Sequence, residues 1–173
     1  GIRALAWHPD GTRLASAGYD TTLRLWDSKT GKELARLDGH ANLVMAVAWH
    51  PDGSRLASAG DDFTVRVWDP VAQKQLVRLD GHASRVTAVA WHPDGTRLAS
   101  AGNDNTLRVW DAATGKQLKR LDGHTNRVMA VAWHPDGTRL ASGGYDNTLR
   151  VWDAATGKEQ ARHKGTTKGV IAV

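Results

Sequence analysis

The chain has 173 residues, no cysteine and a formal net charge of +5. A chain of this length usually forms one domain, and without cysteine it has neither disulfides nor thiolate metal ligands. No apolar run approaches the roughly 18 residues of a membrane helix. The first residues, Gly-Ile-Arg-Ala, lack the charged and apolar segments of a secretory signal. We therefore expect no membrane partner, and a secretory signal is either absent or already removed.

Most of the arginines recur in three sets whose members lie 42 residues apart. The sets are Arg13, Arg55, Arg97 and Arg139; Arg24, Arg66, Arg108 and Arg150; and Arg36, Arg78, Arg120 and Arg162. This spacing spreads positive charge around the molecule, so we expect a solvated basic surface rather than one patch. The aromatic residues are nearly all tryptophan, which leaves no visible Phe or Tyr platform for base stacking. We therefore do not expect nucleic acid as a partner.

Three short motifs return along the chain with a period of 42 residues. Trp-His-Pro-Asp-Gly begins at Trp7, Trp49, Trp91 and Trp133, Trp-Asp begins at Trp26, Trp68, Trp110 and Trp152, and Gly-His begins at Gly39, Gly81 and Gly123. Self-similarity at a fixed period predicts a repeat architecture. We divide the chain into units 1–38, 39–80, 81–122 and 123–164, followed by an extra inner-strand segment, 165–173.

Each unit predicts four short strands, and unit 39–80 illustrates the pattern. Residues 44–49 are apolar and suit a strand buried on both faces, and the following Pro-Asp-Gly favours a tight turn. Residues 55–60 form a second expected strand of small side chains, and residues 64–68 alternate and are rich in β-branched residues. Residues 75–79 complete the set. Four strands in about 40–45 residues are typical of a propeller blade.

Gly-His, followed by Trp-Asp near the end of the third expected strand, resembles the WD40-repeat β-propeller family on this period. The resemblance covers the whole chain, and the closeness of the units resembles recently amplified bacterial arrays or an engineered derivative. It implies an all-β fold with four four-stranded blades per chain. It also implies a non-catalytic interaction scaffold, for which we expect no cofactor and, if the array is natural, a cytoplasmic location.

Serine, histidine and aspartate recur together and could form a hydrolase triad, but an enzyme needs one such set in a cleft and this chain repeats it. The resemblance implies instead a buried hydrogen-bonded tetrad with the tryptophan of the third strand. The sets are His40, Ser58, Asp62 and Trp68; His82, Ser100, Asp104 and Trp110; His124, Ser142, Asp146 and Trp152; and, without an upstream histidine, Ser16, Asp20 and Trp26. We expect these tetrads to be structural, because an unpaired buried polar group costs about 1–3 kcal/mol.

A second set of histidines stands beside proline in the first turn of each unit. These are His8, His50, His92 and His134. One histidine per unit lacks the close pairing of zinc ligands, so we expect no metal site and assign these side chains to surface turns. Thr-Gly-Lys runs lack the upstream glycine of a phosphate-binding loop.

The resemblance also implies a partner-binding face where the central channel opens. The residues assigned to it are Arg3, Tyr19, Leu43, Met45, Asp61, Arg85, Thr87, Asn103, Arg127, Met129 and Tyr145. These positions vary among units while their neighbours stay fixed. Two explanations are open. The positions could be solvated and free to change, or they could form a face adapted to an unknown protein or peptide.

Four blades are half of an eight-bladed ring, and a half ring leaves apolar blade faces bare. Head-to-tail closure of two chains into one ring removes those faces, so we expect a homodimer. Residues 169–173 align with residues 1–5, so Val170 and Val173 would compete with Ile2 and Leu5 of the partner, or add beside them. The alternatives are a four-bladed monomeric ring, a higher oligomer, and a docking or sensor fragment of a larger bacterial signalling protein.

Overall fold

The protein is described from a computed structural model that covers residues 1–165 and 169–170. The described residues form sixteen β-strands in four antiparallel sheets, each with its four strands in chain order. Helix is absent from these residues, and so is any helix that could cross a membrane. The predicted all-β architecture of four four-stranded blades is therefore confirmed.

We call the sheets blades 1 to 4. Blade 1 holds β1 (Ile2–Trp7), β2 (Arg13–Gly18), β3 (Leu23–Asp27) and β4 (Glu33–Leu37), and blade 2 holds β5 (Val44–Trp49), β6 (Leu56–Gly60), β7 (Val65–Asp69) and β8 (Lys74–Leu79). Blade 3 holds β9 (Val86–Trp91), β10 (Arg97–Gly102), β11 (Leu107–Asp111) and β12 (Gln117–Leu121), and blade 4 holds β13 (Val128–Trp133), β14 (Arg139–Gly144), β15 (Thr148–Asp153) and β16 (Glu159–Lys164).

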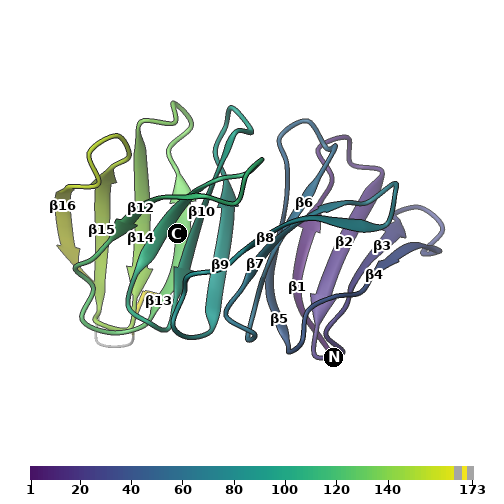
Figure 1. Cartoon of the computed structure of the whole chain (residues 1–173), viewed down its shortest axis with the longest axis horizontal. Coiled ribbons are helices and arrows are strands. Elements are labelled where there is room, and N and C mark those ends of the chain that lie inside the picture. The colour runs from purple at the N-terminus through teal and green to yellow at the C-terminus, as the bar shows by residue number, and fades with distance from the viewer. Residues whose placement is uncertain (166–168, 171–173) are drawn as a thin grey trace.

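The four blades stand side by side in chain order, with blade 1 and blade 4 at opposite ends of the row (Figure 1). The first strands of successive blades contact one another, β1 with β5, β5 with β9, and β9 with β13. Each blade is thus joined to the next through its inner strand and the adjoining second strand. The two end blades each have a neighbour on one side only.

Local sequence explains the turns and the small shifts in strand limits. The backbone N–H of Gly53 donates to the His50 carbonyl at 2.9 Å, and its φ of +76° lies in the left-handed region that glycine tolerates. In the second unit β6 begins one residue later than predicted, and β7 begins and ends one residue later. Thr64 belongs to the turn because its N–H donates to the Asp62 carboxylate at 3.2 Å.

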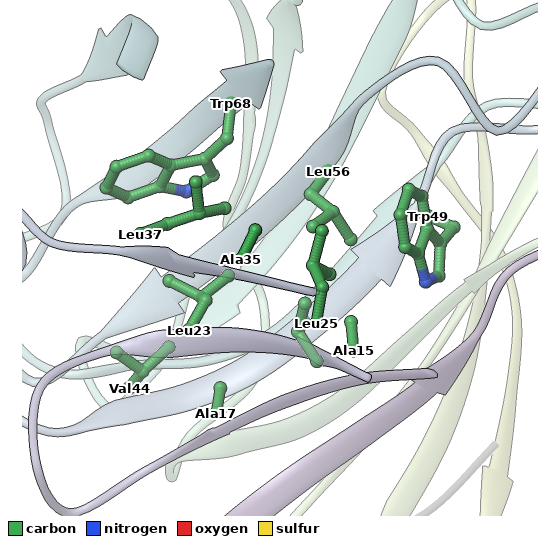
Figure 2. Packing of buried hydrophobic residues seen from close by; sticks show 11 residues of the cluster. Ala15, Ala17, Leu23, Leu25, Ala35, Leu37, Val44, Trp49, Leu56 and Trp68 are labelled. Atoms are coloured by element: carbon green, nitrogen blue, oxygen red, sulfur yellow. The ribbon is translucent and has the colours of Figure 1, made fainter. Parts of the chain in front are cut away.

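The hydrophobic core lies between neighbouring blades rather than inside any one of them. One cluster joins small residues of β2, such as Ala15 and Ala17, with Leu25 of β3 and with Val44 and Trp49 of blade 2 (Figure 2). Equivalent clusters lie between blades 2 and 3 and between blades 3 and 4. Small side chains on the second strands let the sheets approach closely, so each blade is stabilised by its neighbour, as in other repeat proteins.

Candidate interaction site

A chain of hydrogen bonds crosses blade 2 from its entering loop to its third strand. His40 Nδ1 lies 2.9 Å from an Asp62 carboxylate oxygen, and its Nε2 lies 2.6 Å from the Ser58 hydroxyl. The Trp68 indole N–H donates to the same hydroxyl at 2.8 Å. A neutral imidazole satisfies all of these contacts, with its Nδ1–H donating to Asp62 and its Nε2 accepting the serine proton. Ser58 is fully buried, so its hydroxyl is held inside the blade.

Blades 3 and 4 repeat this arrangement. His82 contacts Asp104 at 2.9 Å and Ser100 at 2.7 Å, His124 contacts Asp146 and Ser142 at 2.8 Å each, and Trp110 and Trp152 donate to the two serines at 2.8 Å. In blade 1 the Trp26 indole donates to Ser16 at 2.8 Å. Asp20 there is about half exposed, and with Ser16 and Trp26 it lines a hollow where the other blades hold an imidazole.

The second arginine set departs from the expected solvated surface. Arg66, Arg108 and Arg150 are buried. The Arg150 guanidinium donates to Asp146 at 3.1 Å and to Glu159 of β16 at 2.7 Å, so it joins the aspartate to the outer strand. The prediction of a solvated basic surface is therefore wrong for these three arginines, because each guanidinium has an acidic partner four residues earlier and a polar partner on the neighbouring strand. Arg24 of the same set is 31% exposed.

Burial and hydrogen bonding both move the pKa values of these groups. Burial lowers the pKa of His40 and His124 below the usual histidine value, despite their aspartate partners. Burial alone would raise the pKa of Asp146, but hydrogen bonds from Thr148, the Thr125 backbone N–H and His124 outweigh it and lower the pKa to about 2. The aspartates of blades 2 and 3 shift in the same direction. In blades 2 and 4 the folded state therefore favours neutral histidine beside ionised aspartate.

The residues assigned to a channel face divide into two groups. Arg85 forms two contacts of 2.7 Å with Asp61 of the preceding blade, and the Thr87 hydroxyl donates to the Val128 carbonyl at 2.6 Å, so these side chains join neighbouring blades. The other group does not join blades: Arg3, Tyr19, Arg127 and Tyr145 are exposed, and Leu43, Met45, Asn103 and Met129 are half-buried. Arg127 and Tyr145 also line a shallow hollow with Asn126.

The histidines beside proline are not all surface residues, and that prediction is wrong for three of the four. His8 is buried against Trp49 of the next blade, with ring centroids 4.5 Å apart in an edge-on arrangement. Its Nε2 lies 3.1 Å from the carbonyl oxygen of Gly53, also in the next blade. His50 and His92 make the same contacts one blade further on, and only His134 is exposed. Each of these histidines stands in the same motif, Trp-His-Pro-Asp-Gly. This repetition is the sequence feature that indicates packing between units.

The two ends of the row lack the contacts that bury the same positions elsewhere. Ile2, Leu5 and Trp7 of β1 are 65, 59 and 62% exposed, whereas Val44, Val47 and Trp49 at the equivalent positions of β5 are 0, 9 and 8% exposed. At the other end, a hollow on blade 4 is lined by Ala132, Trp133, His134, Pro135, Arg139, Leu140, Ala141 and Val151. We call the exposed side of β1 the first end face and this hollow the last-blade hollow. No group of acidic or histidine side chains suited to a metal ion occurs among residues 1–165 and 169–170.

Replacing Asp104 with alanine should lower the free energy of unfolding by about 3 kcal/mol. The change leaves the imidazole of His82, the backbone N–H of Ala83 and the guanidinium of Arg108 without their carboxylate. Thermal and urea unfolding measure the loss. Asp122→Ala is the matched control, because this exposed carboxylate pairs only with exposed Arg120 and should change stability by less than about 0.5 kcal/mol. Equal effects of the two substitutions would contradict the assignment.

Stability should fall as pH is lowered, in two steps. Unfolded histidine and aspartate take up protons near pH 6.5 and 3.9, and their folded pKa values are lower, so the unfolded state binds more protons as pH falls. Urea unfolding at about pH 7.5, 5 and 3 should show a loss below pH 6.5 and a further loss from about pH 4 toward 2. Asp146→Asn should make the acidic step smaller, because Asp62 and Asp104 still contribute to it, and constant stability over this range would refute the account.

Comparison with known proteins agrees with this geometry. The sequence matches the family described as WDR19 first beta-propeller over residues 3–167. A search of curated proteins found no match. WD40-type propellers are generally non-catalytic and generally mediate protein–protein interaction. Since the match spans nearly the whole chain and the structure repeats one four-stranded sheet four times, the chain belongs to the WD40-type β-propeller repeat family.

Proposed function

We propose that this protein is a non-catalytic interaction scaffold that assembles with itself, two copies closing head to tail into an eight-bladed ring. The observation that carries the proposal is the exposure of Ile2, Leu5 and Trp7, whose counterparts in every later blade are buried or half-buried. A blade in this fold hides its apolar face against the next blade. A second copy offers that missing neighbour at both ends of the row.

The energetics favour closure by two copies over an open chain of copies. Burying one large apolar side chain contributes roughly 1.5–3 kcal/mol, and association costs about 4–15 kcal/mol in translational and rotational freedom. A closed pair forms two junctions for one such cost, whereas an open pair forms only one junction. Head-to-tail contacts close into rings when the rotation allows it and otherwise extend into filaments.

The tetrads support this scaffold as structural elements rather than as catalytic sites. Ser58, Ser100 and Ser142 are fully buried, and each hydroxyl serves both a histidine and a tryptophan. A hydrolase needs its nucleophile open to substrate. We propose that the tetrads fix the entering loop of each blade to its third strand.

An unknown protein or peptide is the proposed partner of the channel side. Tyr19, Tyr145 and Arg127 are exposed there, and tyrosine and arginine are frequent anchors of protein interfaces. Asp61, Arg85 and Thr87 support this side by joining blades and are less available to a partner.

The end of the described chain opposes closure in part. Val170 packs beside Gly143 of β14, the position that corresponds to Ala17, against which Val44 packs between blades 1 and 2. Its backbone N–H donates to the Gly144 carbonyl at 3.0 Å. Ile2 of a second copy would take this place, so the two segments would compete, which is one of the two arrangements expected from the sequence. Val173 lies outside the described residues.

Native mass in solution tests the proposal. Light scattering and native mass spectrometry should give twice the chain mass of 18.7 kDa, and dilution should release the monomer because the junctions are non-covalent. A compact monomer at every concentration would refute self-assembly and leave only the interaction role. A mass that keeps growing with concentration would indicate filaments instead of a ring.

A further inference from the structure

We propose that Trp7 of one copy inserts into the last-blade hollow of a second copy, and that this contact is the junction of the assembly. The inference rests on the proposed function and names the residues that perform it. Trp7 and the hollow lie at opposite ends of the same chain, so the contact is head to tail. The chain forms three junctions of the same kind internally, between successive blades.

The internal junctions repeat one tryptophan contact without exception. The indole N–H groups of Trp49, Trp91 and Trp133 donate to the carbonyl oxygens of Ala6, Ala48 and Ala90 in the preceding blade at 3.1, 3.2 and 3.3 Å. Each ring meets the histidine of that preceding blade edge on. At two junctions an arginine lies over the ring, 5.6 Å from its centroid, which adds a cation–π attraction.

A second contact accompanies each tryptophan. Nε2 of His8, His50 and His92 lies 3.0–3.1 Å from the carbonyl oxygen of the turn glycine in the following blade, which is Gly53, Gly95 and Gly137 in turn. A methyl group added to any of these glycines would collide with the histidine. These glycines are buried by the junction.

The first end face carries the tryptophan half of this junction without a partner. Trp7 is 62% exposed. Gly11, which corresponds to Gly53, is exposed, and a methyl group added to it would meet no atom within 4 Å. One face of the chain thus presents the indole and the turn carbonyl of a fourth junction.

The last-blade hollow carries the other half. Its volume is about 300 Å³, at the lower end of the range for pockets that hold a bound group. Ala132, His134, Arg139 and Ala141 in its wall correspond to Ala6, His8, Arg13 and Ala15, which surround Trp49. The His134 side chain is 45% exposed, whereas the His8 side chain is 6% exposed. The wall of a tryptophan site is therefore complete here.

Docking in the internal geometry would let the Trp7 indole N–H donate to the Ala132 carbonyl and bring His134 against the Gly11 carbonyl. Gly169 and Val170 contact Tyr145 and Gly143, residues that do not line the hollow. The described part of the C-terminal segment thus competes with Ile2 for its place and leaves the tryptophan site open.

Complementation between two variants tests the head-to-tail contact. Trp7→Ala removes the indole, and Ala141→Phe fills the hollow. Each alone should raise the dissociation constant of the dimer about 30-fold or more, whereas Leu118→Ala, an exposed apolar position on β12, should leave it unchanged. A mixture should form dimer more readily than either variant alone, because each mixed pair contains one intact junction. Circular dichroism checks that every variant is folded.

The outcomes separate this contact from the proposed function. Two variants that dimerise like the wild type would overturn the tryptophan contact while self-assembly stands. Weakened variants that fail to complement one another would overturn the head-to-tail pairing. A wild-type chain that stays monomeric would overturn both.

Gly11→Ala provides an independent test with a matched control. Gly11 and Gly157 have φ values of +73° and +77°, so alanine costs the same backbone strain at either position. A methyl group at Gly157 meets only the Lys119 side chain, at an ordinary contact distance of 3.9 Å. Gly11→Ala should raise the dissociation constant at least about tenfold by obstructing His134 of the second copy, and Gly157→Ala should not. Equal effects would overturn the proposal.

Discussion

Packing of one sheet face against the next is the constraint on which this structure depends. A single blade has four short strands, and Ala57, Ala59 and Val67 of blade 2 are fully buried in a cluster with residues of blade 3. The second strands carry alanine and serine because a larger side chain would hold the sheets apart. Stability therefore comes from junctions between repeats, and a blade without a neighbour exposes the surface that the fold is built to hide.

In blade 2 a network of hydrogen bonds pairs the polar groups that the apolar packing removes from water. The Trp68 indole and the Asp62 carboxylate are both removed from water, and the hydroxyl of Ser58 and the imidazole of His40 link them. Arg66 adds a charge partner for the aspartate and reaches Gln75 on the outer strand. All four strands or their connecting loops are thus tied together. A low internal dielectric makes a complete network rigid and an incomplete one costly.

The sequence alone predicts the repeat period, the strand order and most strand limits, because these depend on residues close together in one unit. It does not predict the burial of His8, since the atoms that cover it come from Trp49 and Gly53 in the following unit. The sequence does not predict the burial of Arg66 for a related reason: Asp62 lies four residues earlier across a turn, and only the register of β7 with β8 brings Gln75 beside the guanidinium. The spacing of the residues alone does not predict which side chains of a tetrad are hydrogen-bonded to one another. The resemblance to the WD40 family implies those pairs.

At the two ends of the row, residues that are buried elsewhere lack the neighbour that covers them. Trp7 has the same neighbours within its own blade as Trp49 has, yet the first is mostly exposed and the second is buried. His134 and His8 differ in the same way at the other end. In the proposed junction one face supplies the tryptophan and the other face supplies its site, so a dimer that pairs two identical faces would leave both sites unfilled. The sequence repeat therefore sets the polarity of any assembly: a copy added at either end must continue the row in the same direction, and only a closed ring leaves no face bare.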